Sequence, residues 1–140
     1  MSLATYLGCN FNMEITDELT TYNSIDIGYI FSEEENGKNV KEKHFSTKNV
    51  YEIEIPNPLY NLNVYQKKKN PCNYKKSQKD FIALCNFLKE HLNPGEFCEI
   101  YPCWLGEELE PKLGSLTIQL EDYNLAEIKI YEKYLVRLEK

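Results

Sequence analysis

Residues 77–104 read SQKDFIALCNFLKEHLNPGEFCEIYPCW, and this stretch decides the fold. Its first part places five apolar side chains at the i, i+3, i+4, i+7 and i+11 positions that line one face of an α-helix. The pattern predicts an amphipathic helix over about residues 77–92, with Ser77 as N-cap and Asn93-Pro94-Gly95 as the stop signal. The residues of the predicted face are Phe81, Leu84, Cys85, Leu88 and Leu92.

Short runs rich in β-branched and aromatic residues, bounded by turn residues, lie on both sides of this helix and are typical of β-strands. Because strands and helices do not alternate along the chain, we expect an α+β fold in which a mainly antiparallel sheet packs against one principal helix. We expect residues 1–140 to form a single globular domain. The expected strands are Ile25–Phe31, Val50–Ile55, Phe97–Trp104, Ser115–Leu120, Ala126–Ile130 and Tyr134–Leu138, with a further strand around Thr5–Ile15.

Two segments lack a regular pattern. Glu33–Lys38 is expected to be an exposed loop, and within residues 56–76 the pattern does not distinguish helix from strand over Leu59–Tyr65. A lysine-rich run follows, and it has two interpretations: an anion site with Tyr65 and Tyr74 available for stacking, or a solvated loop that leads into the helix. The net charge favours the loop. The lysines of the run are Lys67, Lys68, Lys69, Lys75, Lys76 and Lys79.

The overall charge narrows the possible partners. The 140 residues carry 16 Lys and Arg against 22 Asp and Glu, which gives a net charge of −6. An acidic protein is a poor match to a polyanion and a better match to a basic protein, so we expect no nucleic-acid partner. No apolar run reaches the ~18 residues of a membrane span, and the first residues do not resemble a secretory signal. We therefore expect a cytoplasmic protein with no membrane partner.

The sequence contains no recognisable catalytic, metal or cofactor motif. Five irregularly spaced cysteines are typical of reduced thiols, and two histidines 47 positions apart do not indicate a zinc site. Cys85 and Cys98 are expected in the core, whereas Cys103 could point outward and react. His44 is expected to be solvated or to lie on an edge strand, and His91 to complement the helix dipole. We expect no cofactor, no metal and no enzymatic activity.

The acidic and aromatic segment that begins at Phe97 is the best functional candidate. Alternation along the strand places Glu99, Tyr101 and Cys103 on one face, and Pro102 indicates a strand edge or a bulge. Such an edge suits docking of a basic partner, because aromatic side chains anchor interfaces and acidic groups accelerate encounter. The equally supported alternative is that Trp104 is core and the glutamates only solubilise. The proposed partner-binding residues are Glu99, Tyr101, Trp104, Glu107, Glu108 and Glu110.

The run DFIALCNFLKEHL at residues 80–92, followed by NPGEFCEIYPCW at 93–104, resembles small bacterial proteins of the toxin-immunity kind. As a class, such proteins bind a cognate toxin domain and block its active site or substrate path. The resemblance implies a non-enzymatic module whose acidic and aromatic residues mask or mimic the substrate of a basic toxin. Two alternatives stay open: a small cysteine-dependent enzyme or redox protein acting through Cys103 or Cys98, and a homo-oligomeric subunit that pairs strand edges.

Overall fold

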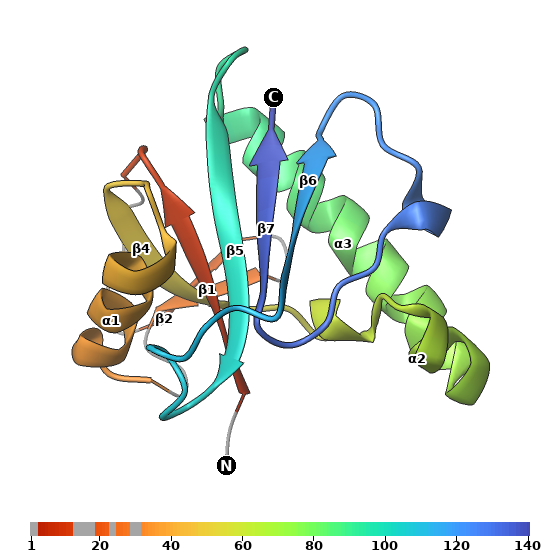
Figure 1. Ribbon diagram of the computed structural model, residues 1–140. Coiled ribbons are helices and arrows are strands. Elements are labelled where there is room, and N and C mark those ends of the chain that lie inside the picture. The colour runs from red at the N-terminus through yellow and green to blue at the C-terminus, as the bar shows by residue number, and fades with distance from the viewer. Residues whose placement is uncertain (1–2, 13–18, 23–24, 29–31) are drawn as a thin grey trace.

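The computed structural model describes residues 3–12, 19–22, 25–28 and 32–140. Seven strands, three α-helices and two short 3₁₀ helices, η1 and η2, are found in these ranges (Figure 1). In chain order they are β1 (Leu3–Cys9), β2 (Leu19–Tyr22), β3 (Ile25–Gly28), α1 (Glu34–His44), β4 (Asn49–Glu54), η1 (Leu59–Asn61), α2 (Val64–Lys69), α3 (Pro71–His91), β5 (Phe97–Trp104), β6 (Gly114–Gln119), η2 (Leu125–Glu127) and β7 (Tyr134–Glu139).

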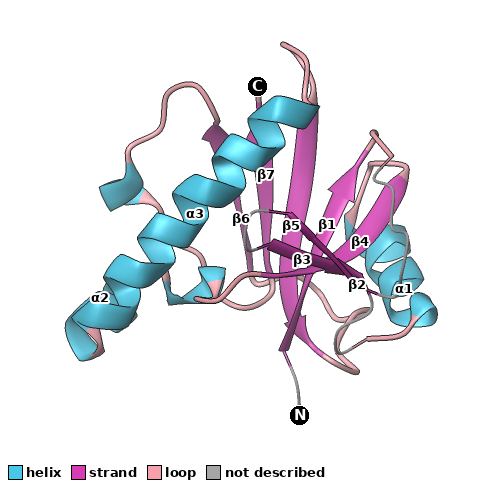
Figure 2. Cartoon of the chain, turned by 180° about the vertical axis from the view of Figure 1, so that it is seen from behind, coloured by secondary structure: helices cyan, strands magenta, loops and turns pink. Residues whose placement is uncertain are grey.

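The strands form one sheet in the order β2-β3-β4-β1-β5-β7-β6. Every neighbouring pair is antiparallel except β6 and β7, which run parallel. Helix α3 crosses one face of the sheet, and α1 lies on the opposite side (Figures 1 and 2). The predicted α+β fold, a mainly antiparallel sheet packed against one principal helix, is therefore confirmed.

The principal helix begins earlier than predicted. It spans Pro71–His91, and the N-cap is Asn70, whose side-chain oxygen accepts from the backbone N–H of Asn73 at 3.5 Å. Proline is favoured at the first helical position because its missing N–H would have no partner there. Ser77, the expected N-cap, instead lies buried within the helix. The lysine-rich run therefore forms helix rather than the expected loop.

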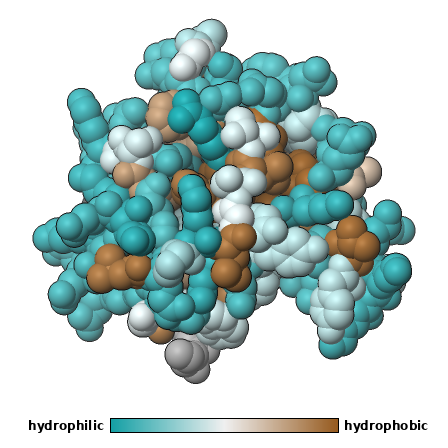
Figure 3. All heavy atoms as spheres, viewed as in Figure 1, coloured by the Kyte–Doolittle hydropathy of each residue, from teal (hydrophilic) through white to brown (hydrophobic). Residues whose placement is uncertain are grey.

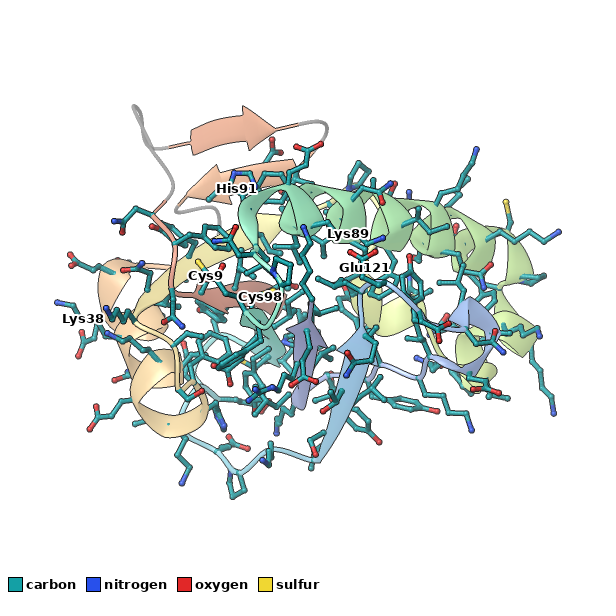
Figure 4. All side chains as sticks on the ribbon, turned by 90° about the horizontal axis from the view of Figure 1, so that it is seen from above. Cys9, Lys38, Lys89, His91, Cys98 and Glu121 are labelled. Atoms are coloured by element: carbon teal, nitrogen blue, oxygen red, sulfur yellow. The ribbon has the colours of Figure 1, made fainter. Side chains whose placement is uncertain are left out.

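The apolar face of α3 fills the larger core. All five residues predicted for this face are buried, and they pack with side chains of the sheet such as Leu7, Ile27, Ile100 and Leu138. Cys9 and Cys98 lie close together in this core, as Figure 4 shows. The same view shows Lys89 and Glu121 pointing toward one another; their charged groups are 4.0 Å apart and link α3 to the loop after β6.

A smaller core occupies the opposite face of the sheet. Tyr6 of β1 pairs with Tyr101 of β5, and both side chains are fully buried beside Val40 of α1. Ala4 and Cys103 complete this cluster. Strand β5 thus contributes Cys98 and Ile100 to one core and Tyr101 and Cys103 to the other, as the alternation predicts.

Two predicted segments have a different structure. Glu33–Lys38 is not a loop: Glu33 and Asn36 form a reciprocal capping box that begins α1. Ala126–Ile130 is not a strand, because Asn124 caps η2 there and the Ile130 N–H donates to the Leu62 carbonyl at 2.7 Å. The alternation in this segment instead places Ile128 and Ile130 in the core.

The other predicted strands are present with shifted ends. β3 matches the described part of Ile25–Phe31. β1 covers only the beginning of Thr5–Ile15, because residues 10–12 are not in a strand. Residues 29–31 and 13–15 lie outside the described ranges. Val50–Ile55, Ser115–Leu120 and Tyr134–Leu138 correspond to β4, β6 and β7, and Phe97–Trp104 has the predicted bounds. In the undecided segment, η1 precedes α2, whose N-cap Asn63 accepts from the Gln66 N–H at 3.0 Å.

Two nearby positions of α3, one buried and one partly exposed, test the packing of this helix. Leu84 is fully buried, whereas Ile82 is 39% exposed. We expect Leu84→Ala to lower the free energy of unfolding by about 2–5 kcal/mol, because it leaves a cavity in the larger core. Ile82→Ala should change it by less than about 1 kcal/mol. Urea unfolding followed by circular dichroism measures both, and equal losses would contradict the assigned helix face.

Candidate functional site

The six residues predicted to bind a partner divide into a buried and a surface group. They lie on β5 from Glu99 onward and on the loop 105–113, which follows it near α1 (Figure 1). Glu99, Tyr101 and Glu108 are buried, whereas Trp104, Glu107 and Glu110 reach the surface. The expectation that these three are exposed for docking is therefore wrong. Helix α1 and its flanking loops cover the β5 face with Glu99 and Tyr101, and Glu108 turns inward from the loop to Asn36 and Gly106.

Glu99 has a structural role at the turn between α1 and β4. One carboxylate oxygen accepts from the backbone N–H groups of Ser46 and Thr47 at 2.9 and 3.2 Å, and from the Ser46 hydroxyl at 3.1 Å. Hydrogen bonds to a carboxylate are stronger than those between neutral groups. Glu99 thus satisfies a turn that would otherwise leave its amides without partners.

Tyr101 is covered by His44, the last residue of α1. The two rings stack with centroids 4.0 Å apart, and the His44 Nε2 lies 3.0 Å from the Glu108 carbonyl oxygen. Burial lowers the pKa of His44 and raises the pKa of Tyr101 to about 12. Both groups therefore stay neutral at pH 7, and His44 is a packed residue instead of the solvated or edge-strand residue that the sequence predicts.

Glu108 fastens the loop to α1. Its carboxylate accepts from the Gly106 N–H at 2.8 Å and from the Asn36 side-chain amide at 2.5 Å. Gly106 has a φ of 98°, which favours glycine and allows the tight turn in which the Glu107 N–H donates to the Trp104 carbonyl at 3.0 Å. The loop leaves β5 in a defined direction as a result.

Lys133 holds the same loop from the other side. Its ammonium group lies 2.9 Å from a Glu110 oxygen and 3.3 Å from a Glu107 oxygen. Its backbone N–H donates to the Pro102 carbonyl at 2.6 Å, and its own carbonyl accepts from the Leu113 N–H at 2.8 Å. Within the described ranges it is the one non-glycine residue with a left-handed φ, 58°. Sequence reasoning missed Lys133, because no local pattern connects it to residues 102–113.

Pro102 was expected to mark a strand edge, and the structure modifies this expectation. β5 lies inside the sheet, and Pro102 is paired with Thr5 of β1. On the other side, the ladder between β5 and β7 covers only Phe97–Ile100, and beyond it the Pro102 carbonyl accepts from Lys133. Because a proline cannot donate to a ladder, it is tolerated where one neighbouring strand has already diverged.

Trp104 borders a shallow hollow. The indole N–H donates to a Glu132 carboxylate oxygen at 2.6 Å, and the hollow of about 570 Å³ is lined by Trp104, Glu107, Glu132 and Lys133. The Lys133 ammonium group pairs with Glu107 and Glu110, whereas the Glu132 carboxylate is bonded to the indole N–H. With three carboxylates and one ammonium group, the region has a net negative charge.

Two large apolar side chains project from the loop beside this hollow. Leu109 is 55% exposed and Leu113 is 65% exposed. In Figure 3, hydrophobic side chains on the viewed face form separate areas among hydrophilic ones. The same loop supplies Glu107 to the hollow, so its two exposed leucines and the acidic hollow together form a candidate contact surface. We call this set the Trp104 surface; it comprises Trp104, Glu107, Leu109, Glu110, Leu113, Glu132 and Lys133.

Four of the five thiols are buried. Cys103, for which an outward orientation was left open, is fully buried, and burial raises its pKa to about 12. Burial likewise raises the pKa of Cys98 well above its usual range. Cys72 at the start of α3 is exposed. Among the described residues, no three or more His, Cys, Asp or Glu side chains gather into a group that could hold a metal ion.

Comparison with known proteins adds no assignment to this geometry. Neither a family model, nor a curated protein, nor a solved structure matches the chain. In the described ranges, no helix combines the length and the apolar character needed to cross a membrane.

Glu108 and Glu110 form a matched pair for testing how the loop is held. We expect Glu108→Gln to lower the free energy of unfolding by about 1–3 kcal/mol, because it replaces a buried acceptor with an amide that cannot serve both donors equally. Glu110→Gln, at an exposed ion pair, should cost less than about 1 kcal/mol. Urea unfolding compares the two, and equal stability of both variants would contradict the buried role of Glu108.

The burial of the thiols predicts their reactivity. At pH 8 a thiol of pKa about 12 is ionised in roughly one molecule in ten thousand, so only Cys72 should react rapidly with a disulfide reagent. The folded protein should release one equivalent of chromophore, the unfolded protein five, and a folded Cys72→Ser variant none. Rapid labelling of Cys98 or Cys103 in the folded state would contradict this prediction and favour a thiol enzyme.

Proposed function

We propose that this protein is a non-enzymatic binding module that docks a basic protein domain on the Trp104 surface. The observation that carries the proposal is the exposure of Leu109 and Leu113 on a loop whose position is fixed at both ends. Exposed apolar side chains on a mobile loop would lose much of their contact energy to ordering on binding. Here Glu108 and Lys133 hold the loop before any partner arrives.

The charge of the surface favours a basic partner. The three negative charges of Glu107, Glu110 and Glu132 outnumber the single positive charge of Lys133. The whole protein carries a net charge of −6. A guanidinium or ammonium group from a partner could take the place of Lys133 beside Glu110, whose side chain is half exposed. Trp104 can add a flat aromatic contact at the same position, and tryptophan is enriched among residues that dominate binding energy.

A toxin domain is the partner class that we propose in particular. An immunity protein needs a rigid, acidic and partly apolar surface and no catalytic machinery, and the Trp104 surface has these properties. The buried thiols support this function over a cysteine-dependent enzyme, because Cys98 and Cys103 are inaccessible and neutral at pH 7. The proposed binding set now contains Trp104, Glu107 and Glu110 of the original six, with Leu109 and Leu113 added.

The test starts from the protein encoded beside this one in its genome, expressed with and without this chain. We expect a 1:1 complex. The double variant Leu113→Ala/Glu110→Lys should weaken its affinity at least about a hundredfold, because it removes an interface anchor and reverses a charge. Isothermal titration calorimetry measures the affinity. The matched control is Glu127→Lys, which makes the same charge change at an exposed position of η2.

Two outcomes would contradict the proposal. One is a complex whose affinity is the same for the double variant and the wild type, since binding would then use another surface. The other is turnover of a small-molecule substrate that is lost in Cys98→Ser or Cys103→Ser while the variant stays folded.

A further inference from the structure

The segment that leads into and begins α3 is the most strongly basic part of the chain. Residues 55–79 contain six lysines and no acidic residue, whereas the rest of the chain holds ten basic and all 22 acidic residues. All six lysines are exposed. Because they lie on α2 and the first turns of α3, residues 64–79 form a cationic corner that we call the lysine hairpin.

The lysine hairpin projects from the body of the molecule. Figures 1 and 2 show α2 beside the beginning of α3, at the corner farthest from α1. Residues 67–73 are exposed without interruption, and Tyr74 is the first buried side chain after them. The hairpin is therefore convex, and it suits a broad, open target better than a small ligand that needs a cleft.

Two apolar side chains accompany the lysines on the outer face of α2. Val64 is 47% exposed and Tyr65 is 58% exposed. They lie four residues before Lys68 and Lys69, so the outer face of α2 carries apolar groups at its start and ammonium groups at its end. The Lys69 ammonium lies 3.0 Å from the Tyr65 hydroxyl. Lysine, tyrosine and an aliphatic residue on one short face are typical of contact with the headgroup region of a bilayer.

A nucleic acid fits this corner less well. Stacking of bases would use Tyr65 and Tyr74, but Tyr74 is buried beneath Lys67, whose ammonium lies 5.9 Å from the ring centroid. One exposed ring on a convex corner does not make a groove for a strand, and Val64 would have no partner on a phosphate chain. Clusters of four to eight lysines on a helix are, by contrast, a recurring feature of proteins that bind acidic lipids.

The net charge of −6 does not prevent such a contact. At physiological ionic strength the Debye length is about 8 Å, whereas a 21-residue helix is about 30 Å long. Acidic residues at the far end of α3 and on α1 are therefore screened from a surface that touches the hairpin. The expectation of no membrane partner came from the missing spanning segment, and a peripheral contact needs no such segment.

We propose that the lysine hairpin binds the surface of a bilayer that contains anionic phospholipid, with α2 lying in the headgroup region and its lysines close to lipid phosphates and carboxylates. This inference does not depend on the proposed function, since the two surfaces share no residue. It would hold the protein at a membrane with the Trp104 surface free.

Vesicle flotation with the full chain tests the inference. The protein should float with phosphatidylcholine vesicles that contain phosphatidylserine, and it should stay in solution with phosphatidylcholine alone. Each lysine near such a surface strengthens binding about fivefold, so Lys68→Gln/Lys69→Gln/Lys76→Gln should weaken partitioning about a hundredfold. The matched control is Lys43→Gln/Lys48→Gln/Lys112→Gln, which makes the same charge change at exposed positions away from the hairpin and should bind like the wild type.

A second variant tests the apolar contribution. Val64→Ser/Tyr65→Ser retains all six lysines and should weaken binding severalfold at high salt, where screening reduces the lysine contribution. Equal binding to both kinds of vesicle, or equal loss in the hairpin and control triple variants, would overturn the inference. So would tighter binding to a short single-stranded oligonucleotide or to an acidic peptide than to the anionic vesicles. Variants of the Trp104 surface should float normally, which separates this result from the proposed function.

Discussion

The burial of β5 on both faces is the constraint on which the rest of the structure depends. Six consecutive residues of this strand, Cys98–Cys103, are buried, so each face needs its own cover. Helix α3 covers the face with Cys98 and Ile100, and α1 covers the face with Tyr101 and Cys103. A carboxylate in such a strand must be satisfied internally, since an unpaired buried charge is strongly destabilising. Glu99 meets this demand by accepting from the turn that positions α1.

The parts of the fold that were predicted are those set by local periodicity. The face of α3, the bounds of β5 and the division of β5 residues between two faces all follow from spacing along the chain. The N-terminus of α3 was predicted wrongly because more than one residue could serve as its N-cap. Asn70, followed by Pro71, caps the helix in place of Ser77. In Ala126–Ile130, the alternating pattern correctly predicts that Ile128 and Ile130 are buried. It does not produce a strand, because no neighbouring strand pairs with this segment in the described ranges.

The candidate site was less predictable, because alternation tells which face a side chain occupies and not whether that face is covered. Glu99 and Tyr101 were assigned to the correct face of β5, but α1 covers that face and buries both side chains. Glu107, Glu108 and Glu110 resembled a uniform acidic turn, yet one points inward to Gly106 and two pair with Lys133. The number of acidic residues in a segment therefore overstates the charge available to a partner. What the loop offers instead is a fixed geometry in which Leu109 and Leu113 are exposed on the segment that follows Trp104.

That fixed geometry is the central claim, and amide hydrogen exchange of the free protein tests it most directly. The Leu113 N–H donates to Lys133, the Lys133 N–H to Pro102 and the Gly106 N–H to Glu108. If the loop is held in place before a partner binds, these three amides exchange at least about a hundredfold more slowly than in an unfolded chain, as stable hydrogen bonds in folded segments do. Exchange of all three at unfolded rates, in a protein whose β5 amides remain protected, would contradict the claim.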